Sequence, residues 1–351
     1  MRLRPPRLPF ACTNTGTGNT DVTAYAASVG HSVWFSDDTG ETWNRAHTNT
    51  GGVYNESRCW CVSTHADRPG EVLSGTDIGV YRWDLAASRW NYIPSPMDGM
   101  HILQIEQHPD DADFIVAGTR PAAIYISEDG GISWRKAPLG NASECEFINT
   151  PRVTSIQFDP TEPDTIWATI EIDAIWRSHD RGRSWQRLGD GLRTDDTHNL
   201  VIIDNLGARR ILCSTELGLH RSDDNGETWN FVDVPQAPWP YFRCMARRPD
   251  NSGTLFLSVG DRPSGETGLL LRSRDWGETW EDAGLPTPVN STIWWIGANP
   301  ADPMLIFCCT IMGQIFRSTD GGEKWEKMRR ELGELRMIAW APTPSQAVQA
   351  A

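Results

Sequence analysis

The chain has 351 residues, which is enough for a large buried core and fits a single closed β architecture. Its formal net charge of −14 argues against nucleic acid or an anionic membrane surface as a partner, because phosphate groups are bound by basic surfaces. The sequence contains no run of about 18 apolar residues, so no segment is expected to span a membrane.

Residues 1–20 precede the first predicted strand and carry basic residues and prolines but no apolar stretch. A secretory leader requires such a stretch, so we expect a flexible arm on a cytoplasmic protein. The 8 cysteines contain no Cys-x-x-Cys pair with zinc spacing. We therefore expect free thiols in a reducing compartment, with no disulfide framework.

The earliest strand of the chain is predicted at residues 22–27, and an unusual turn follows it. The turn reads Ser36-x-Asp38-x-Gly40-x-Thr42-Trp43. An Asp side chain can accept hydrogen bonds from backbone N–H groups, and a Gly tolerates positive φ. The Trp then opens the next strand and provides a large apolar surface for packing.

The same turn recurs along almost the whole chain. Clear copies occur at 127–134, 178–185, 222–229, 273–280 and 318–325, the last with Lys324 in place of the hydroxyl residue. A degenerate copy at 81–90 keeps only the closing Trp90. The seven closing tryptophans are 44 to 51 residues apart, and a period in this range with strands inside it predicts a propeller or a related array.

Each repeat has the pattern of one four-stranded propeller blade. An apolar first strand leads through a Pro- and Asp-rich turn to two further strands, the recurrent turn and a fourth strand. First strands are expected at 58–63, 101–106, 153–158, 198–203, 241–246 and 292–297.

The first repeat lacks this opening strand, whereas residues 335–342 have its pattern with no turn after them. We therefore predict an all-β, seven-bladed propeller of antiparallel blades spanning residues 21–342, with the C-terminal strand pairing with 22–27 to close the ring. Residues 343–351 are expected to be a disordered tail.

The recurrent octapeptide resembles the Asp-box, or BNR repeat, of sialidase-like and glycosyl-hydrolase-like propellers, and the resemblance covers about residues 20 to 342. It implies that the boxes are structural turns on the outer part of each blade, away from any active site. Calcium binding at these turns is not expected, because one or two carboxylates fall short of the six to eight oxygens that calcium takes.

The resemblance does not fix the function, because Asp-boxes occur in sialidases, xyloglucan-active glycosidases, sorting receptors and photosystem assembly factors. Sialidases have six blades, an arginine triad, a Tyr/Glu nucleophile pair and an Arg-Ile-Pro motif that is missing here. Xyloglucan-active relatives use two tandem propellers. Sialidase activity proper is therefore not expected.

Candidate ligand-binding residues are found where first strands begin and where second strands turn into third strands, since both lie at the channel mouth of a propeller. Arg58, Arg120, Arg152 and Tyr241 fall at such positions. An Arg there can fork onto a carboxylate. Alternatively, each Arg pairs with a carboxylate of the neighbouring blade.

Candidate catalytic residues at the same mouth are His101, His198, Glu171 and Asp173. Either His could serve as base or acid, or could simply cap a strand by hydrogen bonding. No local spacing supports a metal site, so neither a metal nor another cofactor is predicted. Four tryptophans near first strands provide either a stacking platform or core packing, namely Trp60, Trp239, Trp294 and Trp295.

Two functions remain open from the sequence. The first is a hydrolase or lyase, glycosidase-like or lactonase-like, acting on a small anionic or carbohydrate-like ligand at the channel mouth. The second is a non-catalytic binding or assembly module similar to photosystem assembly-factor propellers. The cost of burying Arg and His favours the first, whereas a flat exposed apolar patch would favour the second. The oligomeric state is left open.

Overall fold

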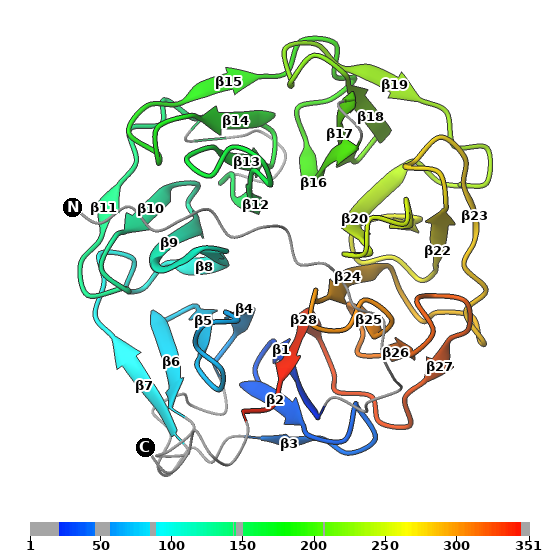
Figure 1. Cartoon of the computed structure of the whole chain (residues 1–351), viewed down its shortest axis with the longest axis horizontal. Helices are drawn as coiled ribbons and strands as arrows, with labels where there is room; N and C mark the ends of the chain where they lie inside the picture. Colours follow the sequence, from blue (N-terminus) through cyan, green and yellow to red (C-terminus); the bar gives the residue numbers. More distant parts are fainter. Residues whose placement is uncertain are drawn as a thin grey trace.

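The computed structural model describes residues 21–45, 57–84, 89–142, 144, 150–205 and 208–344. In this part the chain is all-β, with seven four-stranded antiparallel sheets arranged as a ring (Figure 1). None of the described residues forms a helix long and apolar enough to cross a membrane. The predicted arm at 1–20 and most of the predicted tail lie outside these ranges.

The innermost strand of each blade lines the centre of the ring, and the short fourth strand lies at the periphery (Figure 1). Blades 1 to 4 consist of β28 (Leu335–Pro342) with β1 (Val22–Ser28), β2 (Val33–Ser36) and β3 (Asn44–Arg45); β4 (Cys59–Thr64), β5 (Val72–Thr76), β6 (Val80–Asp84) and β7 (Arg89–Ile93); β8 (His101–His108), β9 (Asp111–Arg120), β10 (Ile124–Ser127) and β11 (Arg135–Lys136); and β12 (Val153–Phe158), β13 (Ile166–Ile170), β14 (Ile175–Ser178) and β15 (Gln186–Leu188). Blades 5 to 7 consist of β16 (Thr197–Asn205), β17 (Ala208–Thr215), β18 (Gly218–Ser222) and β19 (Asn230–Val232); β20 (Tyr241–Arg247), β21 (Leu255–Gly260), β22 (Gly268–Ser273) and β23 (Glu281–Asp282); and β24 (Ile293–Ala298), β25 (Ile306–Thr310), β26 (Ile315–Ser318) and β27 (Glu326–Lys327).

The two ends of the described chain share blade 1, as the repeat pattern predicts. Strand β28 pairs antiparallel with β1, from Val22 opposite Pro342 to Ala27 opposite Met337. Because β28 also packs against the blades on both sides, it completes the ring and leaves no open sheet edge at the junction. The predicted closure is confirmed.

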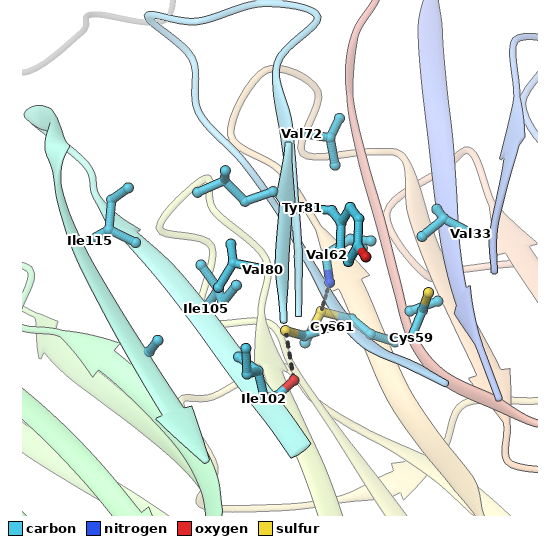
Figure 2. Packing of buried hydrophobic residues seen from close by; sticks show 14 of the residues in the cluster. Val33, Cys59, Cys61, Val62, Val72, Val80, Tyr81, Ile102, Ile105 and Ile115 are labelled. Carbon is cyan, nitrogen blue, oxygen red and sulfur yellow. Dashed lines mark hydrogen bonds between the residues drawn. The ribbon is translucent and has the colours of Figure 1, made fainter. Parts of the chain in front are cut away.

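Neighbouring blades pack through apolar side chains and very close backbone approaches. Between blades 2 and 3, Cys61 lies beside Ile102 and Ile105, and its Sγ hydrogen-bonds to the carbonyl oxygen of Ile102 at 3.6 Å (Figure 2). A Cβ added at Gly75 would lie 2.4 Å from that oxygen, so only glycine fits there. The six described cysteines are all buried and free.

The Asp-boxes are compact hydrogen-bonded turns. In blade 5, Asp224 Oδ1 accepts hydrogen bonds from Ser222 Oγ at 2.7 Å and from the Thr228 backbone N–H at 2.9 Å. The closing Trp229 is 2% exposed and packs between blades 4 and 5. The boxes lie at the same end of each blade as the turns between first and second strands, as the bond from Arg181 N–H to Asp164 O illustrates. This end is opposite the predicted mouth.

Candidate ligand site at the channel mouth

A repeated irregularity of the inner strands forms the mouth of the channel. Near its start, every inner strand carries a β-bulge, at which one or two residues have no counterpart in the register of the neighbouring strand. The residues without a counterpart are Trp60, Leu103, Thr154, His198, Arg243 with Cys244, Trp294 and Arg336. Bulges re-aim side chains and are frequent beside functional sites.

Most of these bulge residues surround one small cavity. It has a volume of about 30 Å³. Its lining consists of Trp60, Leu103, Gln104, Arg152, Val153, Thr154, Arg243, Trp294, Trp295 and Arg336. Six of the seven bulges, all except that of His198, therefore bring side chains from blades far apart in sequence to one point at the centre of the ring.

Three arginines gather at this cavity, and two of them have a carboxylate partner. Arg152 Nη2 lies 2.7 Å from Glu171 Oε1, and Arg336 is paired with Glu334. Arg243 is 6% exposed, and no described residue accepts a hydrogen bond from its Nε or Nη1. Arg243 is therefore the member of the cluster that has no ion-pair or hydrogen-bond partner among the described residues.

The crowding of the guanidinium groups affects their pKa values. Burial, together with the positive charges of Arg152 and Arg243 and against the effect of Glu334, lowers the pKa of Arg336 to about 10. The pKa of Arg243 is lowered by burial and by Arg152. An anion placed among the three guanidinium groups would relieve both effects.

Two tryptophans alternate with the arginines. The guanidinium carbon of Arg243 lies 4.0 Å from the centroid of the Trp294 ring. Arg336 lies 4.9 Å from the Trp294 ring and 5.3 Å from that of Trp60. These cation–π contacts hold the guanidinium planes in place without using their N–H donors, which remain available for a ligand.

The predicted residues His198 and Tyr241 lie together beside the arginines, in contact at 4.8 Å between ring centroids. His198 Nδ1 donates to the carbonyl oxygen of Phe242 at 2.6 Å, and Nε2 lies 3.3 Å from Asp196 Oδ1. Burial favours a raised pKa for Asp196, but His198, Arg152 and Arg243 together lower it below the usual value. Both nitrogens of His198 are thus engaged.

The two predicted carboxylates are also engaged. Glu171 is ion-paired with Arg152. Asp173 accepts hydrogen bonds from Arg187 Nε at 2.9 Å and from the Ala142 backbone N–H at 2.8 Å. The turn that carries both is strained, since Ile172 and Ala174 have φ of 61° and 58°. Catalytic roles for Glu171 and Asp173 stay predictions.

The remaining predicted residues form a second group on the side of blades 2 and 3. His101 stacks on Trp60 with ring centroids 5.1 Å apart, and it lies opposite Arg120 in the register of β8 and β9. Burial lowers the pKa of His101; nearby Arg120 and Arg58 add to this effect, and Asp77 opposes it. The structure thus brings Arg58, His101 and Arg120 together, and their roles stay predictions.

The sequence analysis missed Arg243 and Arg336. It considered the first residue of each inner strand, whereas the bulges direct the second or third residue toward the channel. A usable signal was present, because a charged residue interrupts an otherwise apolar strand in Phe242-Arg243-Cys244 and in Leu335-Arg336-Met337.

In the described ranges, no group of three or more His, Cys, Asp or Glu residues is placed to hold a metal ion.

The sequence profile of the BNR/Asp-box repeat matches residues 125–136, the third-strand and box region of blade 3. Together with the seven four-stranded sheets, this match shows a seven-bladed propeller that carries a BNR/Asp-box repeat.

The curated relatives of this propeller include hydrolases. A xyloglucanase from Paenibacillus sp. is 25% identical over 240 residues, covering 56% of this chain and 22% of that protein. A xyloglucanase from Acetivibrio thermocellus is 23% identical, with coverage of 55% and 27%. Sortilin from Danio rerio is 22% identical, with coverage of 59% and 24%. The propeller therefore spans only about a quarter of these relatives.

Solved structures share the fold at low identity. The GH74 xyloglucanase from Xanthomonas campestris aligns with a TM-score of 0.59 and 21% identity, covering 82% of this chain and 46% of that one. YCF48 bound to D1 peptide aligns with a TM-score of 0.51 and 14% identity, covering 77% and 81%. Xyloglucanases are thus among the distant homologues of this propeller, and the YCF48 structure shares its fold.

Proposed function

We propose that this propeller binds a carboxylate-bearing ligand at the channel mouth, between the guanidinium groups of Arg152, Arg243 and Arg336. The observation that carries the proposal is the buried, unpaired guanidinium of Arg243. A buried charge without a partner is costly, and a carboxylate is the planar anion that a guanidinium fork binds best. The positive charge is also local, since the whole protein has a net charge of −14.

The size of the cavity limits what enters it. About 30 Å³ accommodates a small polar group and not a sugar ring or a side chain of any length. The carboxylate would enter, and the rest of the ligand would lie over the mouth. Trp60 and His101 on one side, with Arg58 and Arg120 beside them, would meet the part that remains outside.

Two kinds of molecule carry such a carboxylate, a small sugar acid and the C-terminus of a peptide. The xyloglucanase relatives act on a carbohydrate by name, and the YCF48 structure holds a peptide. The shared chemistry is the carboxylate, so the test compares glucuronate with glucose, and a short peptide acid with its amide.

Isothermal titration of these four probes provides the test. For whichever acid binds, we expect its neutral counterpart not to bind, and Arg243→Gln to weaken binding by roughly 2–5 kcal/mol, as truncation of a buried charge pair does. Arg262→Gln is the matched control, because Arg262 lies on the same face, is 59% exposed and is paired only with Glu266 in the described part. Equal binding of an acid and its neutral counterpart, or unchanged binding in Arg243→Gln, would refute the proposal.

Glycoside or lactone hydrolysis is the second candidate, and it is favoured by the xyloglucanase relatives and by the tryptophans at the mouth. Glycosidases require two carboxyl groups that act as acid and as base or nucleophile. Glu171 and Asp173 would fill these roles, with His101 or His198 as an alternative base, once a substrate displaces their present partners. The test is release of reducing sugar from xyloglucan oligosaccharides, and turnover of gluconolactone. Turnover lost in Glu171→Gln but kept in Arg262→Gln would support this candidate, whereas no turnover by the wild type would reject it.

A further inference from the structure

A second, larger chamber lies in the same channel, toward the Asp-box face. Its volume is about 430 Å³, within the range of small-molecule sites. All seven inner strands contribute to its wall, as do Pro160, Pro249 and Pro300 from the turns at the box end. Trp295 lines both chambers and therefore lies between them.

The chamber wall carries two ionisable side chains without partners. Glu106 comes from β8 and Arg247 from β20, and neither makes an ion pair or hydrogen bond with any described residue. Both keep some exposed surface, which is the surface that lines the chamber. Most arginines in the described part of this propeller have a carboxylate or carbonyl partner, and Arg247, like Arg243 at the mouth, is an exception.

Desolvation acts on each of these groups and no neighbour compensates for it. Burial raises the pKa of Glu106 to about 8, so at neutral pH it is a carboxylic acid that can donate a hydrogen bond. Burial lowers the pKa of Arg247 without removing its charge. The wall therefore combines one cation with one neutral donor, in a space of ligand size.

We propose that the larger chamber, toward the Asp-box face, is a second binding site. Its ligand is a small hydroxy acid whose carboxylate pairs with Arg247 and whose hydroxyl hydrogen-bonds to Glu106. A single unpaired guanidinium selects one anionic group. The protonated Glu106 carboxyl has one O–H donor and one carbonyl acceptor, and a ligand hydroxyl, which both accepts and donates, satisfies the two together. A cation has no carboxylate cluster to bind to among the lining residues.

This site is separate from the carboxylate site at the mouth. The small cavity at the mouth is lined by Arg152, Arg243 and Arg336, none of which reaches the larger chamber. The larger chamber is lined by Glu106 and Arg247, neither of which reaches the mouth cavity. A ligand could therefore occupy either site alone, and a substitution in one is expected to leave the other intact.

The test is isothermal titration of gluconate, lactate and inorganic phosphate into the full chain, with glucose as the neutral control. We expect at least one hydroxy acid to bind, phosphate to bind more weakly because it offers no hydroxyl-bearing carbon chain to Glu106, and glucose not to bind. Arg247→Gln should weaken binding of the hydroxy acid by about tenfold or more, and Glu106→Gln, which keeps a donor, should weaken it less.

The controls separate this proposal from the previous one. Arg183→Gln removes a 61% exposed arginine from the box face and should leave binding unchanged. Arg243→Gln should weaken acid binding at the mouth and preserve binding in the chamber. Binding of the hydroxy acid that survives both Arg247→Gln and Glu106→Gln, or no binding of any probe at millimolar concentration, would overturn the proposal.

Discussion

Single residues in this propeller have two different roles, one in stability and one in binding. Each box Asp accepts hydrogen bonds from within its own turn and lies at the end of the blade opposite the mouth. Arg243, in contrast, has a guanidinium that the fold buries but does not pair. Residues that satisfy all their own contacts are expected to affect stability when replaced, and residues left unsatisfied are expected to affect binding.

Replacement of the closing Trp of blade 5 tests the first kind. Trp229→Ala leaves a large void between blades 4 and 5, because Trp229 packs there at 2% exposure. We expect a loss of about 3–5 kcal/mol in the free energy of unfolding. Chemical denaturation measures this loss, and ligand titration should show unchanged affinity. Full stability with lost binding would instead make the box a functional site.

The box Asp predicts an acid-dependent loss of stability. Hydrogen bonds from Thr228 and Ser222 hold the pKa of Asp224 at about 2, below its ordinary value of 3.8. Because the folded pKa is depressed, this contribution is fully present above pH 3.8 and is lost as the pH falls toward 2. The melting temperature of Asp224→Asn should therefore lie below that of the wild type at neutral pH, with the gap closing in that acid window. A gap that is constant with pH would contradict the assignment.

At the scale of elements, the inner strand is the unit that organises the molecule. Strand β28 pairs with β1, so this contact joins the two ends of the described chain. Strand β28 also packs against blades 2 and 7. Each inner strand also carries the bulge that turns a side chain into the channel.

Removal of β28 should therefore prevent folding. A chain ending at residue 334 would lose Trp340 and Ile338 from the core and expose the edge of β1. We expect insoluble protein or a spectrum without a cooperative melt. The control is a chain ending at residue 344, which keeps all of β28 and should melt like the wild type. A cooperative melt of the shorter chain would show that closure is dispensable.

The repeat pattern predicted the strands well and the site only in part. Turn residues and closing tryptophans recur at regular spacing, so seven blades and their closure followed from local signals. Arg152 was predicted because it precedes an inner strand. Arg243 and Arg336 were missed because a bulge shifts the side-chain alternation by one residue, and the sequence of a single strand does not reveal where that shift occurs. Asp173 lies in a turn with strained φ angles, which places its carboxylate against Arg187.

At the scale of the whole molecule, charge is distributed unevenly. The protein has a net charge of −14, yet four arginines line the two cavities of its channel. They face Glu171, Glu334 and Asp196 beside the small cavity at the mouth, and the isolated Glu106 in the larger chamber. The acidic outer surface repels anions, whereas the arginines of the channel attract them. An anionic ligand is therefore expected to bind selectively at the centre of the ring.

The most direct test of the carboxylate site is a crystal structure of the propeller with a bound acid, either glucuronate or the short peptide acid. The account predicts that the carboxylate oxygens lie within hydrogen-bonding distance of Arg243 and of at least one of Arg152 and Arg336, with the remainder of the ligand over Trp60. A ligand bound at the mouth with its carboxylate directed away from all three arginines would contradict it.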